Sequence, residues 1–411
     1  VPENRQKPDS RLIRLPLMLI FSKNKSEEPP IFYLTGGPGV SNMKFNPASD
    51  LLKNHDVVML GYRGVDGASR LDCPEIEEVI GNSKNILGEK ALQMLNHAMV
   101  RDFARLQAQG TDLEGYTIVE VMHDLADAGK SLGYEKINLL SESYGTRIAL
   151  IYAAAFPERT HRSVMLGANP PGRFVWAPDM VDKQIRQYAK LYAESGEPDA
   201  LPKNLAGVLK EISRNMPERW MGFSIDPGKV KVMTFVFLFH RQTAAMIFDA
   251  YLSAAAGDAS GLALLSQAYD FAIPSMFVWG DFLLKAYTAD FNPARNYQTE
   301  LSPDSSIIGS PLSLYFWAAA PDSLPLIPKR YRLPQQSDAE TLILSGNLDF
   351  STPAEYAERE MLPYLKNGKQ IIFSDYGHVN DLWKIKDMNM PNLISMYFLT
   401  GETMQFETVQ T

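Results

Sequence analysis

The chain has 411 residues, 45% hydrophobic and 21% charged, with a formal net charge of −8 at pH 7. This length allows one large domain or two to three ordinary ones. Its mildly acidic, scattered charge argues against nucleic acid as a main partner, because phosphate binding requires a clustered basic face.

Cysteine content and hydropathy narrow the class of protein further. A single cysteine, Cys73, excludes a disulfide within the chain, and no Cys/His cluster has zinc spacing. No metal or organic cofactor is expected. The longest apolar run, "MTFVFLF" (233–239), is far shorter than the roughly 18 residues of a membrane span, which predicts a soluble protein. We interpret the start at Val1 instead of methionine as N-terminal processing or truncation, which is compatible with a secreted or periplasmic protein. The sequence indicates neither the compartment nor the oligomeric state.

Short β-like runs alternate with helix-like stretches over roughly the first 170 residues. The expected strands are "RLIRLPLMLIF" (11–21), "PPIFYLT" (29–35), "HDVVMLGY" (55–62), "INLLS" (137–141) and "HRSVMLGA" (161–168). A helical segment is expected at about 88–133, and another at 144–156, where Pro157 ends it. Strands separated by helices of this length predict a mostly parallel sheet with right-handed crossovers.

The pattern changes after residue 170. Residues 171–337 lack β-runs at sheet spacing and are rich in helix formers and aromatic residues. The β/α alternation resumes with "ETLILSGNLD" (340–349), "PAEYAERE" (353–360), "KQIIFSDYGH" (369–378) and "NMPNLISMYFLTG" (389–401). We therefore predict an α/β core formed by 1–170 and 338–411, with a mainly helical cap domain, 171–337, inserted before a late strand.

Ser143 lies where a tight strand-to-helix turn is expected, in "INLLSESYGTRIAL" (137–150). A nucleophile on such a turn needs small neighbours two residues before and after it, and Ser141 and Gly145 meet this requirement. The alternative is that Ser143 only opens the helix as an N-cap.

Asp349 and His378 follow the two late strands, at "TLILSGNLD" (341–349) and "KQIIFSDYGH" (369–378). Acyl transfer by a serine requires a base for its proton and a carboxylate that orients the base. The order Ser143, Asp349, His378 is the one expected for this sheet topology, so these three are the predicted catalytic triad. Asp375 is a rival carboxylate, but it lies only three residues before His378. Taken singly, Asp349 could be a turn residue and His378 a structural histidine.

An oxyanion hole would need two backbone N–H groups aimed at the developing negative charge. The residue after the nucleophile, Tyr144, supplies one. The loop "FYLTGGPGVS" (32–41) follows an early strand, and Gly37 is the candidate for the second. In the same loop Gly36 and Gly39 allow close backbone approach, and Pro38 stiffens it.

Together these motifs resemble the α/β-hydrolase superfamily, in the branch of prolyl iminopeptidases and tripeptidyl aminopeptidases. "TGGPGVS" resembles that branch's GGPG loop, "GYRGVDGASRLDCPE" (61–75) its D-Q-R-G-x-G-x-S segment, and "SESYGT" (141–146) its G-x-S-Y-G-T elbow. "LILSGNLDFSTP" and "YGH" resemble its acid and base segments. The resemblance covers about 20–170 and 338–400, and implies an α/β-hydrolase fold with a serine hydrolase triad.

Three departures from the branch's motifs bear on the substrate. Thr35 stands in place of histidine, Ser141 in place of glycine, and Gly61 and Tyr62 in place of the aspartate and glutamine. The first and third argue against strict iminopeptidase activity. The triad is unaffected.

The cap's aromatic residues favour a hydrophobic substrate. They are Phe235, Phe237, Phe239, Phe248, Tyr251, Phe277, Trp279, Phe282, Tyr287, Tyr315, Phe316 and Trp317. Most are expected to form the cap's own core. No acidic cluster for an amino group stands out, and the Glu142 side chain is expected to point away from Ser143.

Three functions follow, in order of preference. The first is hydrolysis of a carboxylic ester of a hydrophobic small molecule. The second is aminopeptidase activity on short peptides, and the third is a catalytically silent binding module. A cap carboxylate facing the cleft would favour the second over the first.

Overall fold

A computed structural model describes residues 1–24, 27–195, 204–321, 324–386 and 388–403. Its strands are β1 (Leu17–Ile20), β2 (Ile31–Leu34), β3 (Val57–Leu60), β4 (Ile137–Glu142), β5 (Thr160–Leu166), β6 (Arg219–Trp220), β7 (Phe223–Ser224), β8 (Glu340–Gly346) and β9 (Gly368–Phe373). Its α-helices before β8 are α1 (Pro74–Asn82), α2 (Glu89–Ala108), α3 (Ile118–Ser131), α4 (Gly145–Ala155), α5 (Pro178–Ser195), α6 (Leu205–Arg214), α7 (Pro227–Phe237), α8 (Arg241–Ala255), α9 (Ser260–Ala272), α10 (Trp279–Asp290), α11 (Tyr297–Leu301) and α12 (Pro311–Trp317). Those after β8 are α13 (Ala354–Glu360), α14 (Asn380–Trp383) and α15 (Met390–Thr400).

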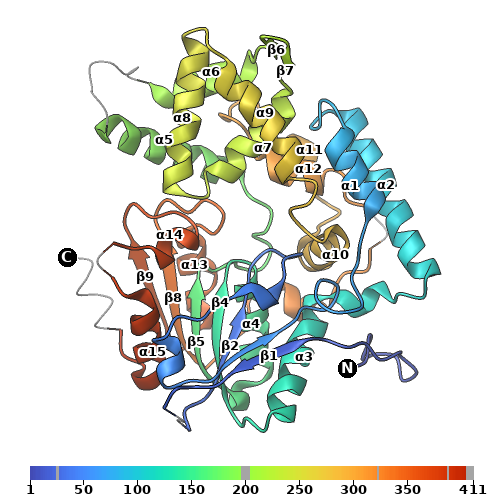
Figure 1. Cartoon of the computed structure of the whole chain (residues 1–411), viewed down its shortest axis with the longest axis vertical. Coiled ribbons are helices and arrows are strands. Elements are labelled where there is room, and N and C mark those ends of the chain that lie inside the picture. Colours follow the sequence, from blue (N-terminus) through green and yellow to red (C-terminus); the bar gives the residue numbers. More distant parts are fainter. Residues whose placement is uncertain (25–26, 196–203, 322–323, 387, 404–411) are drawn as a thin grey trace.

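The centre of the molecule is a seven-stranded sheet with the order β1-β3-β2-β4-β5-β8-β9 (Figure 1). Only β1 runs antiparallel to its neighbour, pairing Leu17 with Leu60 and Ile20 with Val57. The other five pairings are parallel. This is the mostly parallel α/β-hydrolase sheet that the sequence predicted, and it brings the carboxyl ends of β2, β4, β8 and β9 to one edge.

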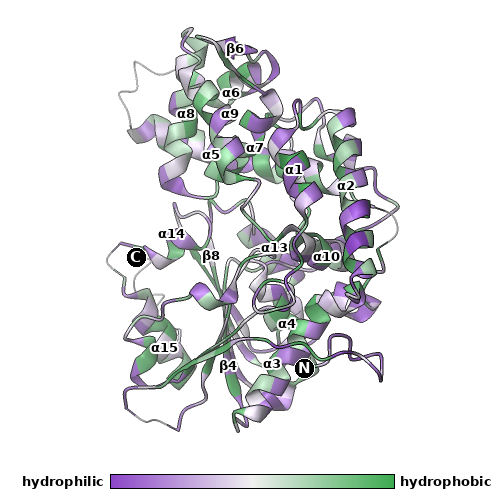
Figure 2. Ribbon diagram, turned by 45° about the vertical axis from the view of Figure 1, so that its right-hand side comes forward, coloured by the Kyte–Doolittle hydropathy of each residue, from purple (hydrophilic) through white to green (hydrophobic). Residues whose placement is uncertain are grey.

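Alternate residues of the strands face two hydrophobic cores, as the two-residue period of a strand requires. Phe32, Val58 and Leu139 face the core that α3 and α4 cover, and this core continues up into the inserted helices. Tyr33, Met59 and Leu140 face the second core, which α15 closes. Figure 2 shows these strands as largely hydrophobic, whereas α2 carries both hydrophilic and hydrophobic residues along its length.

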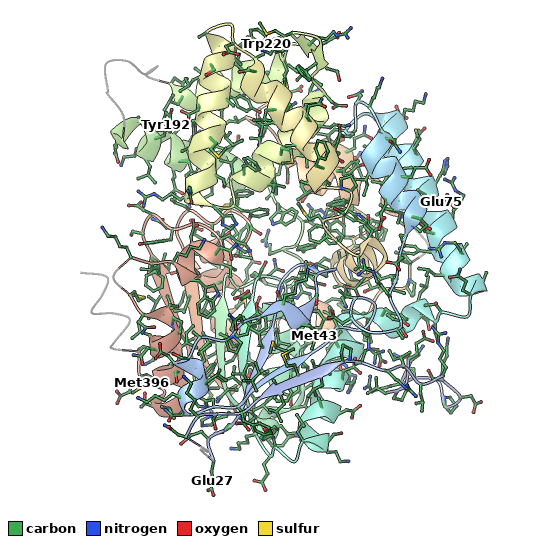
Figure 3. All side chains as sticks on the ribbon, in the orientation of Figure 1. Glu27, Met43, Glu75, Tyr192, Trp220 and Met396 are labelled. Carbon is green, nitrogen blue, oxygen red and sulfur yellow. The ribbon has the colours of Figure 1, made fainter. Side chains whose placement is uncertain are left out.

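The elements between β5 and β8 are α5 to α12 and the short hairpin of β6 and β7. In Figure 1 most of them lie above the sheet's carboxyl edge, whereas α10 lies lower, between the sheet and α2. Side chains fill the space that the ribbon leaves between the upper helices and the sheet (Figure 3). The division into a core and a cap at residues 171 and 337 stays a prediction.

Two expected elements differ in detail from the structure. The expected helical segment at 88–133 is two helices, because α2 ends before Gly110, whose φ of +82° is unfavourable for other residues. The strand expected at 11–21 is limited to β1, which begins directly after Pro16. In the described part of the chain, no helix combines the length and apolar character that membrane crossing requires.

Candidate active site

Ser143 occupies the turn between β4 and α4 in a left-handed conformation, with φ of +49°. This backbone conformation is strained for a residue with a side chain. In a tight strand-to-helix turn it makes the serine side chain project outward from the turn. The space around the turn is tight. A Cβ added to Gly145 would lie 2.4 Å from the Leu34 carbonyl oxygen, and one on Gly36 would lie 2.7 Å from Ser143 Cβ. Ser141 is buried, and its hydroxyl donates to the Val164 carbonyl at 3.2 Å.

The structure brings Ser143, His378 and Asp349 together from three separate strand ends. His378 Nε2 lies 2.9 Å from Ser143 Oγ, and His378 Nδ1 lies 2.7 Å from Asp349 Oδ2. The histidine therefore connects the hydroxyl and the carboxylate in a continuous hydrogen-bonded chain. This geometry lets the imidazole accept the serine proton while the carboxylate fixes its tautomer.

Asp349 is fully buried, and Thr352 donates two hydrogen bonds to its carboxylate. The Thr352 N–H donates to Oδ1 at 2.9 Å and the Thr352 hydroxyl to Oδ2 at 2.6 Å. Burial alone would raise the pKa of Asp349, but attraction to His378 and the hydrogen bonds from His378 and Thr352 hold its pKa below the ordinary value. The backbone N–H of the rival Asp375 donates to Asn347 Oδ1 at 2.7 Å. The carboxylate that hydrogen-bonds His378 is that of Asp349.

The predicted oxyanion loop lies against the serine. Gly37 has a φ of +111° and Gly39 a φ of +78°, conformations that glycine adopts without strain. Within the described residues, no acceptor is hydrogen-bonded to the backbone N–H of Gly37 or of Tyr144. An oxyanion hole requires unpaired backbone N–H groups beside the nucleophile, so both stay candidates for this role.

Helix α10 holds this loop from above. The Gly39 N–H donates to Asp281 Oδ2 at 3.1 Å, and the Gly39 carbonyl accepts from the Val278 N–H at 2.9 Å. Asp281 also contacts Lys285, and both side chains are buried. Burial raises the pKa of Asp281 and lowers that of Lys285. The Lys285 carbonyl in turn accepts from the Tyr144 hydroxyl at 2.9 Å, so α10 contacts both segments that carry the candidate oxyanion donors.

The segment between α7 and α8 holds the histidine loop in a similar way. The His378 N–H donates to the Phe239 carbonyl at 2.8 Å. Asp381 Oδ2 accepts from the N–H groups of both Gly377 and Arg241, each at 2.9 Å. The inserted helices are therefore bonded directly to two of the loops that form the site.

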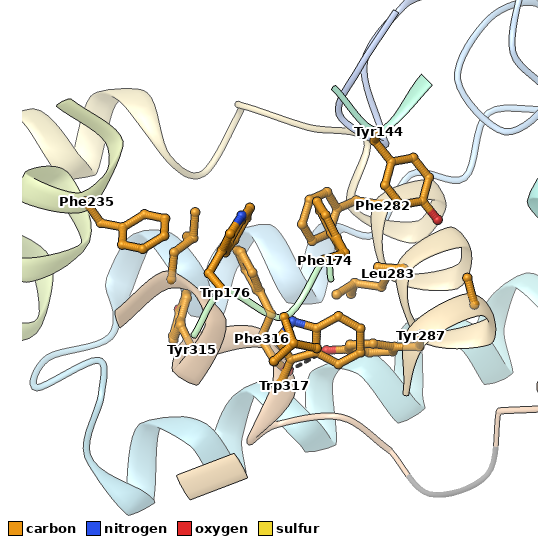
Figure 4. Packing of buried hydrophobic residues seen from close by; sticks show 14 of the residues in the cluster. Tyr144, Phe174, Trp176, Phe235, Phe282, Leu283, Tyr287, Tyr315, Phe316 and Trp317 are labelled. Atoms are coloured by element: carbon orange, nitrogen blue, oxygen red, sulfur yellow. Dashed lines mark hydrogen bonds between the residues drawn. The ribbon is translucent and has the colours of Figure 1, made fainter. Parts of the chain in front are cut away.

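Buried aromatic rings, among them Tyr144, Phe174 and Trp176, pack against one another (Figure 4). The ring of Tyr144 lies 4.9 Å from that of Phe174, which lies 5.1 Å from Trp176. At the other end, the ring of Phe239 lies 5.5 Å from that of His378. Most of the aromatic residues predicted for the cap are buried in the hydrophobic core, as expected, including Trp279, Tyr315 and Phe316.

Several residues of the site escaped the sequence reasoning. Thr352 could have been found in "DFSTP", where a hydroxyl three residues after a turn aspartate can fold back onto it. Asp281 and Lys285 form an i,i+4 pair within an otherwise apolar helix, "WGDFLLKAY", which is the signal for a buried ion pair. Phe239 and Asp381 gave no such signal, because their contacts join segments that are far apart in the chain. In the described ranges, no group of three or more His, Cys, Asp or Glu residues could hold a metal ion.

Comparisons with known proteins agree with this fold. A family model described as "alpha/beta hydrolase fold" matches residues 29–202. Tripeptidyl aminopeptidases of Streptomyces lividans and Streptomyces coelicolor are each 27% identical over 201 residues, which is 45% of this chain and only 37% of each relative's length.

Two solved structures resemble this chain at low sequence identity. An α/β hydrolase enzyme from a Medee basin deep-sea metagenome library is 13% identical, with a TM-score of 0.45, over 95% of this chain and 94% of that one. An esterase from Exiguobacterium antarcticum is 15% identical, with a TM-score of 0.41, over 96% and 98% of the two chains. The sheet order, the strand–Ser143–helix turn and the family match over residues 29–202 show an α/β-hydrolase fold.

Proposed function

We propose that the protein is a serine hydrolase that cleaves an acyl bond in two steps. The observation that supports this most directly is the hydrogen-bonded chain Ser143–His378–Asp349, in which both contacts of the imidazole are shorter than 3.0 Å. Hydrogen bonds of this length are in the range that proton transfer requires.

In the first step the Ser143 hydroxyl attacks the substrate carbonyl while His378 accepts its proton. The Gly37 and Tyr144 N–H groups stabilise the oxyanion, and Asp349 balances the positive imidazolium. His378 then gives the proton to the leaving alcohol or amine, which departs and leaves an acyl-serine. In the second step His378 removes a proton from water, the resulting hydroxide attacks the acyl group, and Ser143 recovers its proton.

The preferred substrate is a carboxylic ester of a hydrophobic small molecule. The Phe239 ring lies 5.5 Å from that of His378 and 6.3 Å from that of Trp176, and such rings favour an apolar acyl or alcohol group. Two acidic residues of the inserted helices that contact the site's surroundings are already paired, Asp281 with Lys285 and Asp290 with Arg147. Neither is therefore free to hold a substrate amino group.

Aminopeptidase activity on short peptides is the second candidate. It is favoured by the similarity to two proteins named tripeptidyl aminopeptidases, even though the match spans little more than a third of their length. The catalytically silent alternative would gain support from a histidine turned away from the serine, and His378 points at it.

The first test is a paired rate comparison of the wild type and Ser143→Ala. The substrates are p-nitrophenyl esters of increasing acyl length and aminoacyl-p-nitroanilides, including those of proline and alanine. We expect ester turnover in the wild type and a loss of several orders of magnitude in the variant, because the attacking oxygen is gone. Anilide turnover that depends on a free amino group would instead favour the aminopeptidase. Near-wild-type turnover by Ser143→Ala would refute the proposed mechanism.

A further inference from the structure

A groove between α5 and α8 encloses a cavity of about 160 Å³ on the inserted helices. The two helices pack against each other and lie side by side at the upper left of Figure 1. Most of the lining is apolar and comes from Leu191, Ala244, Phe248 and two tyrosines. One of these, Tyr192, stacks on Phe248 with ring centroids 5.2 Å apart. Since a water molecule takes up about 30 Å³, the groove has room for a ligand with one six-membered ring.

Arg241 is the one charged residue in the lining of this groove. Its side chain is exposed, and its Nη1 donates to the Asp375 carbonyl at a long 3.4 Å. Among the described residues, no carboxylate lies within ion-pair distance of its guanidinium. A guanidinium has five N–H donors, so most of them are left for a ligand.

Two carboxylates close to the groove are bound to other donors. Asp381 Oδ2 accepts from the backbone N–H groups of Gly377 and Arg241, each at 2.9 Å. Asp249 accepts from the Tyr192 hydroxyl. The Arg241 backbone is therefore used inside the fold, whereas the charge of its side chain is not paired with a described carboxylate.

Tyr188 adds a buried hydroxyl to the groove. A Cβ on Gly377 would lie 2.9 Å from the Tyr188 oxygen, so this side chain reaches the residue before His378. Within the described ranges the hydroxyl has no hydrogen-bond partner. Burial raises the pKa of Tyr188, so the hydroxyl keeps its proton and stays a donor. A buried donor without an acceptor costs free energy, which an acceptor on a ligand would recover.

We propose that this groove binds a small carboxylate with an apolar body. Arg241 pairs with the carboxylate, because the guanidinium fork matches its two oxygens, and Tyr188 supplies a further donor. The apolar lining contacts the body of the ligand. Hydrolysis of a hydrophobic ester releases an acid of this class, and only this link rests on the proposed function. The groove is thus a second site, separate from the triad, for the kind of acid that the reaction produces.

Three substitutions test separate parts of the site. Arg241→Gln removes the charge but keeps the backbone N–H that Asp381 accepts. Ala245→Phe fills the groove from an exposed position of α8, and Tyr188→Phe removes only the buried hydroxyl. Arg219→Gln, on the exposed strand β6 outside the groove, changes the net charge by the same amount as Arg241→Gln and is the matched control.

Binding is measured by fluorine NMR titration at pH 8 with 4-fluorobenzoate, 4-fluorobenzyl alcohol and 4-fluorobenzylammonium. We expect the wild type to bind the benzoate about 3- to 10-fold more tightly than the alcohol, because an ion pair at an exposed arginine contributes modestly. Arg241→Gln should remove this preference and Tyr188→Phe should reduce it. Ala245→Phe should weaken binding of both ligands, and Arg219→Gln should match the wild type.

An equal preference for benzoate in the wild type and Arg241→Gln would overturn the inference. Unchanged binding in Ala245→Phe would do so as well, because the ligand would then lie outside the groove. Tighter binding of the ammonium ion than of the benzoate by the wild type would give the groove the opposite charge preference and also refute it. The titrations need no turnover, so failure of this site is distinguishable from failure of the hydrolase proposal, which the Ser143→Ala rates decide.

Discussion

At the scale of single residues, the position of Ser143 depends on the small size of its neighbours. Gly145 is the most constrained of these, because an added Cβ would meet two backbone oxygens, those of Leu34 at 2.4 Å and Thr35 at 2.5 Å. Backbone atoms of a central strand cannot move aside as the tip of a flexible side chain can. The turn therefore tolerates serine at position 141, two residues before Ser143, but requires glycine at position 145.

Gly145→Ala is expected to lower both activity and stability. The clash should cost about 1–3 kcal/mol of unfolding free energy, as overpacking at a fixed backbone does, and should displace Ser143 from His378. Gly81→Ala is the matched control, since its Cβ would meet Pro274 at an ordinary 3.5 Å within α1. Urea denaturation and ester turnover of the two variants check this. Equal behaviour of the two would show that the turn is not sterically limited.

The pH dependence of stability should carry a signature of Glu142. Burial raises its pKa above the ordinary value, against the opposing hydrogen bonds from Tyr33 and Trp383. The folded state thus holds this proton more tightly than the unfolded state does. Its contribution to stability is present at low pH and is lost as pH rises from the ordinary glutamate value through the raised one.

Glu142→Gln should therefore melt at a higher temperature than the wild type at pH 8, by about 1–3 °C. The difference should shrink as pH falls to 4, where the wild-type carboxyl is protonated. Thermal melts of both proteins over this pH range check the sign. A difference that is independent of pH would show that Glu142 does not titrate in this window.

Much of the site's residue chemistry was predictable, and the reason lies in the topology. Parallel strands end at one edge of a sheet, so Ser143, Asp349 and His378, each following a strand, were expected to meet there. Their catalytic roles stay predictions that the geometry supports. Asp381 was not foreseen, because its contacts join segments that are far apart in the chain and leave no local pattern in the sequence.

At the scale of elements, α10 links the inserted helices to the oxyanion loop. The N-cap Val278 donates to the Gly39 carbonyl, and Asp281 in the first turn accepts from the Gly39 N–H. The carbonyl of Lys285, in the second turn, accepts from the Tyr144 hydroxyl. The loop and α10 are so close at Gly39 that a larger side chain would not fit there. A Cβ on Gly39 would lie 3.0 Å from both Phe282 Cβ and the Val278 oxygen. We expect α10 to fix where the Gly37 N–H points.

Two double variants separate the Gly39 hydrogen bond from the buried ion pair. Both Asp281→Asn/Lys285→Met and Asp281→Leu/Lys285→Met remove the two charges together, which buried pairs often tolerate. Only the first keeps an oxygen for the Gly39 N–H. We expect kcat for an ester to be about 10- to 100-fold lower in the leucine variant than in the asparagine variant, with KM changed less. Steady-state kinetics check this, and equal kcat values would exclude a positioning role for Asp281.

The elements themselves were predictable where the pattern was local. The runs "INLLS" and "YGTRIALIYAAAF" predicted β4 and α4, because each has a recognisable hydrophobic pattern and ends at a residue that stops the element. The sequence could not predict where α10 packs. A helix rich in aromatic residues can be buried inside the cap or against the α/β core, and the pattern does not distinguish the two. Its place depends on Arg63, Tyr144 and Gly39, which are distant in sequence.

At the scale of the whole molecule, Arg63 joins three distant segments below the site. It is fully buried and binds Asp124 of α3 through two hydrogen bonds of 2.6 Å each. It also donates to the carbonyl oxygens of Glu3 and Gly115. Its own carbonyl accepts from Lys285 Nζ at 3.1 Å, which continues the network into α10. The "GYRG" motif noticed in the sequence thus connects the N-terminal segment, the sheet and the inserted helices.

The hydrogen bond between Ser143 and His378 spans 235 positions of the chain. Between them lie the inserted helices, which also supply the Phe239 and Asp281 contacts to the two loops. A newly synthesised or refolding chain can therefore gain most of its helices and its central strands while it still has no working nucleophile. Recovery of activity should then be one of the last events of folding, because contacts of such sequence separation close late. A partly folded chain should therefore have no hydrolase activity.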